Sequence, residues 1–452
     1  MLEYLSSFSA VKTLPVLAGV GVLAVLDLSA RATGRKTRYM FGVIVGTALS
    51  VGLMMAAGAI LSRETMHSGY MVAFGLLLIV ILWRYLFGTW DSVTKATVLG
   101  TFVFWIILRT LVNEAPPERI AHLLAILAAA IPAVVWCALF LPYHRERMSI
   151  VLTMFFAGML STVPILFYDA MVRGGVDLQF FLFRVQPQSF SQSAQSFVAG
   201  QWPGIGSLQL SIGAMLVSFL IVGILEEGSK FWVLKRAGSS FITSVDDMMQ
   251  MAIIVAIGFA FAENITNSGY FLGFVKEYLL DPERRDWMGF TGNVVGRSVL
   301  TSMVHIVSTG VLGYFAGLAI FAGPHLQEHK SRGVRHRVIE YLHRLFGMRR
   351  TEVFRRQMVL AGFTCAVVLH AMSNFLVTLP DVLPGNPRTL GDLLQAGEAS
   401  PLNYVALLLF PTLFYVVGGF YLLTSLFAHK ENMKERGHLI VVDTFVTDQS
   451  EV

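Results

Sequence analysis

Long apolar stretches constrain this chain of 452 residues more than any other feature. A run of about 18 or more residues with few charges can form a helix that crosses the roughly 30 Å hydrocarbon core of a bilayer. The chain contains eleven such stretches, at 11–28, 39–61, 69–86, 93–112, 121–141, 149–168, 208–233, 248–266, 298–321, 358–379 and 404–427. We therefore expect an all-α fold, a polytopic membrane bundle of about eleven transmembrane helices.

The distribution of Lys and Arg between these stretches predicts the orientation. Cytoplasmic connections carry an excess of Lys and Arg, so basic residues should fall in alternate loops. They do so at Arg31, Arg35, Lys36 and Arg38, at Lys95, at Arg145 and Arg147, at Lys235 and Arg236, in 324–356, and at Lys430, Lys434 and Arg436. This pattern predicts an amino terminus outside and a carboxyl terminus in the cytoplasm.

Composition agrees with a membrane protein and argues against two other classes. Only 14% of the residues are charged, whereas about a quarter is usual in soluble proteins. The net charge of +5 is explained by the basic inner loops, so no nucleic-acid partner is expected. Cys137 and Cys365 both lie in predicted spans, so neither a disulfide framework nor a thiolate metal site is expected.

Ionisable side chains interrupt four consecutive apolar stretches, the seventh to the tenth. Such groups are costly at bilayer depth and usually mark a functional site. They are Glu226, Glu227 and Lys230 in 208–233, Glu263 in 248–266, His305 in 298–321, and His370 with the amide Asn374 in 358–379. The first six spans carry ionisable groups only near their ends, where side chains can reach the interface. We expect the chemistry in spans seven to ten.

Helical spacing places several of these groups on shared faces. Residues four apart are neighbours on a helix, which applies to Glu226 and Lys230, and to His370 and Asn374. One structural alternative is that Glu226 pairs with Lys230 and the histidines only bind neighbouring helices. A second alternative is a secondary transporter or a proton or cation pathway that uses the same Glu and His residues.

The motifs resemble those of the PrsW intramembrane proteases, distant relatives of the CAAX prenyl proteases and of bacteriocin-processing proteases. The matching residues are Glu226-Glu227-x-x-Lys230, Phe259-x-x-x-Glu263-Asn264, His305 and His370-x-x-x-Asn374. The resemblance covers residues 208–379 and implies an intramembrane endopeptidase. It also implies a membrane protein substrate, such as an anti-sigma factor, and a bacterial or archaeal cytoplasmic membrane.

Peptide hydrolysis needs a nucleophilic water, a stabilised oxyanion and a protonated leaving amine. Glu226 or Glu227 can act as the base. His305 and His370, with Asn374, can then donate hydrogen bonds to the oxyanion without a metal. Alternatively, Glu263, His305 and His370 form a zinc site and the two glutamates supply the base. The second version is favoured because Glu263 replaces a His of the CAAX relatives with another zinc ligand.

The depths of these residues pose a geometric question. At 1.5 Å per residue from the inner helix ends, Glu263, His305 and His370 lie about 20–25 Å deep. Glu227 lies only about 12 Å deep by the same count. A single site therefore requires tilted, broken or unevenly placed helices.

The predicted organisation has four parts. Residues 1–170 form an accessory bundle of six spans, and 171–207 form an outer loop that lies on the membrane surface. Residues 208–379 form the catalytic core, which includes the basic inner loop 324–356 with an amphipathic helix held by anionic lipid headgroups. Residues 380–452 contain the last span and a cytoplasmic tail. The expected partners are the lipid bilayer and a single-pass membrane protein.

Overall fold

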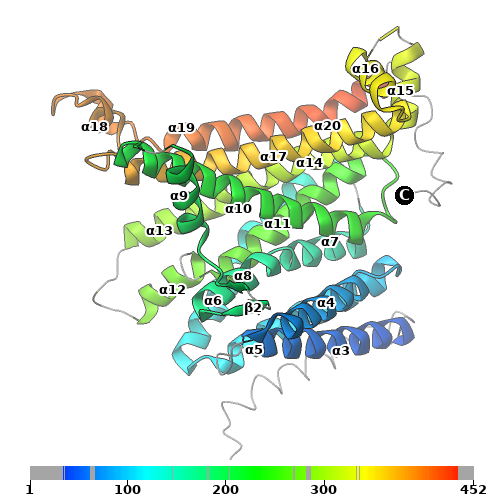
Figure 1. Ribbon diagram of the computed structural model, residues 1–452, viewed down its shortest axis with the longest axis horizontal. Helices are drawn as coiled ribbons and strands as arrows, with labels where there is room; N and C mark the ends of the chain where they lie inside the picture. Colours follow the sequence, from blue (N-terminus) through cyan, green and yellow to red (C-terminus); the bar gives the residue numbers. More distant parts are fainter. Residues whose placement is uncertain are drawn as a thin grey trace, which may run out of the picture.

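A computed structural model describes residues 34–435 except 35, 62–66, 145, 181–182, 203, 268–269, 281–282, 284–286, 332 and 335. Within this part of the chain the protein is an all-α helix bundle, as predicted (Figure 1). Nine helical segments are long and apolar enough to cross a membrane, and Tyr70–Leu86 is a shorter apolar helix. The predicted spans from 39–61 onwards each correspond to one of these helices, whereas 11–28 lies outside the described residues.

The first half of the described chain supplies seven helices and a small sheet. Its helices are α3 (Lys36–Leu61), α4 (Gly69–Leu86), α5 (Ser92–Asn113), α6 (Pro116–Phe140), α7 (Met148–Leu160), α8 (Val163–Gly174) and α9 (Phe190–Gln201). A three-stranded sheet of two- and three-residue strands joins them: β1 (His67–Ser68) pairs parallel with β2 (Leu178–Phe180), and β2 pairs antiparallel with β3 (Phe183–Val185). The predicted outer loop thus contains β2, β3 and α9.

The second half supplies the four helices with intramembrane ionisable groups. They are α10 (Ser207–Gly238), α11 (Val245–Thr266), α14 (Ser302–Ile320) and α17 (Arg350–Val382). Shorter elements connect and follow them: α12 (Phe271–Leu280), α13 (Trp287–Gly296), the π-helix η2 (Arg297–Thr301), α15 (Ala322–Ser331), α16 (Arg337–Phe346), α18 (Leu390–Leu394), the 3₁₀ helix η3 (Pro401–Tyr404), α19 (Leu409–Thr412), the π-helix η4 (Leu413–Gly418) and α20 (Gly419–Glu435). In Figure 1, α10, α14, α17 and α20 run side by side.

Helix α11 is the centre of the bundle. Residues 245–260 are all buried, and the helix packs against α6, α7, α10 and α14. A capping box starts it, because Ser244 Oγ accepts a hydrogen bond from the Asp247 N–H while the Asp247 side chain accepts one from the Ser244 N–H. Most of this helix is therefore enclosed by protein, and Glu263 near its end is partly exposed.

Two glycines allow α7 and α11 to touch backbone to backbone. A Cβ at Gly158 would overlap the Val255 carbonyl, and a Cβ at Gly258 would overlap the Phe155 carbonyl. Small residues permit this close approach between membrane helices. The contact fixes α11 immediately before Phe259, whose ring lies 5.0 Å from the His305 ring.

Substituting Gly258 by Ala should therefore destabilise the protein by about 1–3 kcal/mol, the usual cost of overpacking. Thermal unfolding in detergent measures the effect. Gly58→Ala is the matched control, because a Cβ at Gly58 meets nothing within 4 Å. Equal unfolding temperatures for Gly258→Ala and wild type would contradict the close contact.

The basic inner loop contains the predicted amphipathic helix as α16. Ile339 is buried against α15 and α17 with Ala322, Val353 and Phe354, while Val338, Tyr341 and Leu345 are exposed. Figure 1 shows α15 and α16 together at one end of the bundle. Anchoring of the exposed face by anionic headgroups stays a prediction.

Candidate active site

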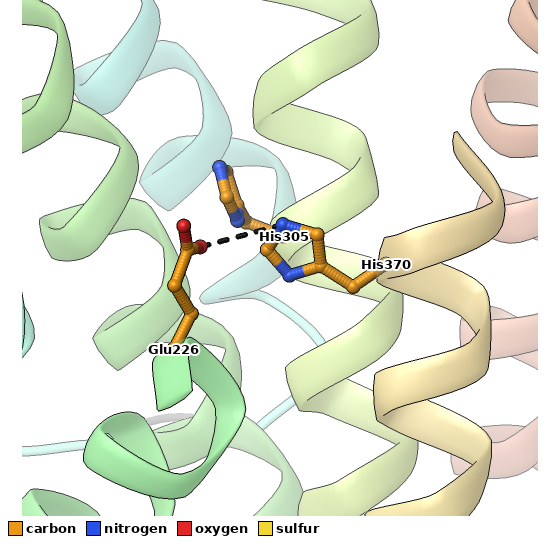
Figure 2. Close-up of side chains that lie close together, drawn as sticks. All are labelled: Glu226, His305 and His370. Carbon is orange, nitrogen blue, oxygen red and sulfur yellow. Dashed lines mark ion pairs between the residues drawn. The ribbon is translucent and has the colours of Figure 1, made fainter. Parts of the chain in front are cut away.

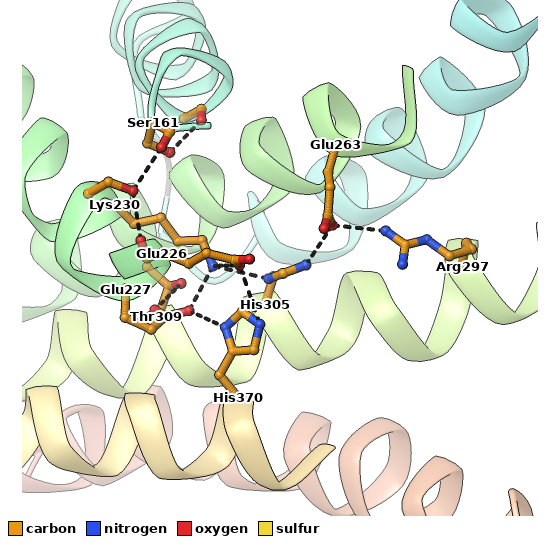
Figure 3. Close-up of polar contacts among 11 residues, drawn as sticks. Ser161, Glu226, Glu227, Lys230, Glu263, Arg297, His305, Thr309 and His370 are labelled. Carbon is orange, nitrogen blue, oxygen red and sulfur yellow. Dashed lines mark hydrogen bonds and ion pairs between the residues drawn. The ribbon is translucent and has the colours of Figure 1, made fainter. Parts of the chain in front are cut away.

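Helix α10 supplies Glu226, Glu227 and Lys230, all of them buried. The Lys230 Nζ donates to Glu227 Oε1 over 2.7 Å, whereas its distance to Glu226 Oε2 is 3.9 Å. The pairing of Lys230 with Glu226 that the four-residue spacing suggests is present as this longer ion pair, but the closer partner is Glu227. The Lys230 ammonium thus binds the carboxylate that also contacts Thr309 on α14 and His370 on α17 (Figure 3).

Glu227 joins three helices and its side chain has no exposed surface. Besides Lys230, its Oε1 lies 2.8 Å from His370 Nδ1, and its Oε2 accepts a hydrogen bond from the Thr309 hydroxyl over 2.9 Å. Both oxygens are therefore engaged. Such a carboxylate fixes the rotamers and the hydrogen positions of its partners more readily than it takes up a proton from water.

His370 on α17 is oriented by this contact. When Nδ1 donates to Glu227, Nε2 carries a lone pair, and Nε2 lies 3.3 Å from Glu226 Oε2 (Figure 2). Although this distance suits an ion pair, the geometry is not that of a hydrogen bond, and Glu226 Oε2 is buried without a hydrogen-bond partner among the described residues. Two acceptor atoms that face each other call for a proton or a cation between them.

His305 on α14 lies between two charged groups. Its Nδ1 is 3.0 Å from Lys230 Nζ and its Nε2 is 3.2 Å from Glu263 Oε2. The Phe259 ring packs against both Lys230 and His305: Lys230 Nζ lies 4.0 Å from the ring centroid, and the His305 ring lies 5.0 Å from it. Phe259, a supporting residue in the sequence prediction, thus helps to enclose the lysine and the imidazole in an apolar wall.

Glu263 and Asn264, near the end of α11, are held by Arg297. The Arg297 Nη2 donates to Glu263 Oε2 over 2.8 Å, and its Nε donates to Asn264 Oδ1 over 3.0 Å. The guanidinium also lies 3.3 Å from the centroid of the Tyr270 ring. Sequence analysis missed Arg297 because it immediately precedes the apolar stretch 298–321. Thr309 was missed because a hydroxyl within a span carries no charge.

The predicted site residues other than Asn374 therefore form one connected group, although they lie at different distances from the ends of their helices. Contacts of 2.7–3.3 Å run from Arg297 through Glu263, His305, Lys230 and Glu227 to His370 and Glu226. The helix ends are not level, since α17 begins eight residues before the predicted 358, so counting from them misjudges depth. Asn374 lies one turn beyond His370 and is half-buried.

The donor atoms fit a metal ion. One ligand atom each from Glu226, His305 and His370 lies within 4.8 Å of the others, and all three residues are buried. Two imidazoles and one carboxylate are a common ligand set for Zn²⁺, and Glu227 on His370 Nδ1 is the outer partner that such a ligand usually has. This set contains Glu226 instead of the predicted Glu263, whose Oε2 is paired with Arg297. The assignment of Glu263 as a ligand stays a prediction.

Buried carboxylates and imidazoles that several membrane-crossing helices bring together can supply the base and the oxyanion or metal contacts that an intramembrane peptidase needs. Comparison with known families agrees: residues 146–396 match the model of the PrsW family intramembrane metalloproteases, and the chain belongs to this family. It is therefore a protease and an integral multi-pass membrane protein, and its substrate is a membrane protein. No curated protein and no solved structure matches the chain.

The matched region starts earlier than the motifs alone indicate. It includes α7, α8 and α9, of which α7 and most of α8 fall in the predicted accessory bundle 1–170. The direct packing of α7 on α11 gives a physical reason for this extent. The family also favours proteolysis over the transporter alternative.

Proposed function

We propose that this protease hydrolyses a peptide bond of a single-pass membrane protein with a water activated beside Glu226. The observation that carries the proposal is the buried Glu226 Oε2, which lacks a hydrogen-bond partner among the described residues and faces His370 Nε2 at 3.3 Å. A carboxylate with a free acceptor is the group best able to take a proton from water. Glu227 is the positioning residue that holds His370 and Lys230.

A metal ion would be held by Glu226, His305 and His370. It would supply Lewis-acid activation of the water and stabilise the oxyanion. Glu263, at 3.2 Å from His305 Nε2, is then the carboxylate left to accept the proton. Arg297 orients this carboxylate through the 2.8 Å ion pair.

A metal-free version is supported by the contact between Lys230 and His305. If the ammonium donates to Nδ1 at 3.0 Å, the hydrogen of the neutral imidazole resides on Nε2. His305 Nε2 is then a hydrogen-bond donor that faces Glu263 Oε2 at 3.2 Å and would stabilise an oxyanion that replaces this contact, and Glu226 is the base. The two versions assign different roles to His305 and to Glu226.

The exposure of the side chains indicates how water and substrate reach the site. Glu227 is fully buried and His305 and His370 are 2% exposed, whereas Glu263 and Arg297 are 17% and 15% exposed. Entry therefore lies at the end of the site formed by α11 and η2. Family resemblance makes an anti-sigma factor in a bacterial or archaeal cytoplasmic membrane the candidate substrate.

Comparison of membranes that contain wild type or Glu227→Gln tests this function. We expect at least one full-length single-pass protein to accumulate with the variant and its shortened product to disappear, as measured by quantitative proteomics of the membrane fraction. Glu398→Gln, which alters an exposed carboxylate, is the control and should match wild type. Identical membrane proteomes for wild type and Glu227→Gln would refute the proposed function.

A further inference from the structure

A second group of possible metal ligands lies at the opposite end of α11 from Glu263. It consists of His144 and Glu146, in the loop between α6 and α7, and Asp247, in the first turn of α11. One ligand atom from each lies within 4.8 Å of the other two. These residues take no part in the candidate active site, since Asp247 and Glu263 are separated by four turns of helix.

The three side chains converge through His144 Nε2. This atom contacts Asp247 Oδ1 and lies 3.8 Å from Glu146 Oε1. The side chains of Glu146 and Asp247 are only 9% and 4% exposed, whereas that of His144 is 33% exposed. The group is thus buried on its carboxylate side and open to solvent on its imidazole side.

Asp247 presents one oxygen in a fixed orientation. Its Oδ2 accepts hydrogen bonds from the Thr243 N–H over 2.6 Å and from the Ser244 N–H over 2.8 Å. The Ser244 bond belongs to the capping box of α11, and neither bond involves His144. Oδ1 is consequently held toward the loop and needs no rearrangement to serve as a ligand.

The charges of the group favour a divalent cation. Two nearly buried carboxylates share one imidazole as their only contacting cation in the group, and the further cation that acts on Glu146 is the neighbouring Arg147. A divalent ion would neutralise both carboxylates and accept the lone pair of a neutral imidazole. One nitrogen and two carboxylate oxygens suit ions such as Zn²⁺ or Mn²⁺ better than Ca²⁺, which takes oxygen ligands.

We propose that His144, Glu146 and Asp247 bind a divalent transition-metal ion that ties the loop between α6 and α7 to the start of α11. The ion joins the helix that carries Glu263 to the preceding part of the bundle. Its role is structural, because the site is far from the catalytic group and closed by protein on the carboxylate side. The competing explanation is a plain hydrogen-bonded pair of His144 and Asp247.

Zinc binding by the full-length protein tests the proposal. The double variant His305→Ala, His370→Ala is the background, because it removes two candidate ligands of the active site. After incubation with ZnCl₂ and removal of free metal, elemental analysis should find about one Zn²⁺ per protein. In this background, His144→Gln and Glu146→Gln should each abolish zinc binding. The zinc-induced rise in unfolding temperature should disappear with the bound ion.

A matched control separates metal binding from the loss of a His–carboxylate pair. His122 is buried and lies 3.1 Å from Glu114 Oε2, but it belongs to no group of three ligands among the described residues. His122→Gln in the same background should therefore keep the bound zinc. Asp247 is left intact because its substitution would break the capping box. Zinc content that is unchanged by both His144→Gln and Glu146→Gln, or absent from the background, overturns the proposal and leaves the hydrogen-bonded pair.

Discussion

Glu226→Gln should reduce peptide cleavage by the purified protease by at least about 10²–10⁴-fold, the range that a general base contributes. The amide keeps the shape of the side chain but neither takes a proton from water nor ligates a metal well. Because Glu226 Oε2 has no hydrogen-bond partner among the described residues, stability should hardly change. Turnover of a reporter with one transmembrane segment, together with thermal unfolding in the same detergent, measures both quantities.

Glu227→Gln provides the contrast, since its carboxylate is bonded to Lys230, His370 and Thr309. An amide leaves the buried ammonium without its 2.7 Å partner, a loss that typically costs about 3–5 kcal/mol. Activity and unfolding temperature should therefore fall together. If Glu226→Gln cleaves the reporter at the wild-type rate, Glu226 is not the base. If the variant that combines Glu226→Gln with Glu227→Gln also does so, the whole group is not the active site.

The second large effect concerns the metal. If Glu226, His305 and His370 hold zinc, His305→Ala and His370→Ala should each lose about one bound ion and all activity, because removing one of three protein ligands weakens such a site sharply. Chelation should inactivate the wild type, and added zinc should restore it. The number of zinc ions bound per protein is best measured in a His144→Gln background, so that only the active site contributes.

The metal-free version predicts a different result for the same proteins. Loss of an oxyanion donor slows turnover by about 10²–10³-fold for each histidine, and the residual activity survives chelation. Elemental analysis of active wild type decides between the versions. A preparation that cleaves the reporter with no bound metal excludes the zinc site and leaves Glu226 as the base.

Sequence alone could predict the helices and the members of the site, because both depend on local patterns. An apolar run of sufficient length forms a helix in a bilayer whatever its neighbours, and an ionisable group such as His370 or Glu263 stands out within it. These helices are observed wherever the predicted spans fall in the described residues.

The pairing within the site depends on helix rotation and translation, which sequence does not determine. Glu226 and Glu227 differ by about 100° around α10, so a modest rotation decides which of them meets Lys230 and His370. Arg297 reaches Glu263 only because η2 brings it beside the end of α11. The level of each helix depends on its neighbours, as the long extension of α17 under α15 and α16 illustrates.

The burial of α11 has a consequence for the biogenesis of the enzyme. This helix is surrounded by partners that are synthesised both before and after it, since α6, α7 and α10 precede it and α14 follows. Glu227 on α10 gains its imidazole partner only from α17, at residue 370. A nascent chain that has inserted its first eight predicted spans therefore lacks both histidines of the site. Proteolytic competence should arise only after α17 has been synthesised and packed against α10, which protects the membrane from cleavage by shorter nascent chains.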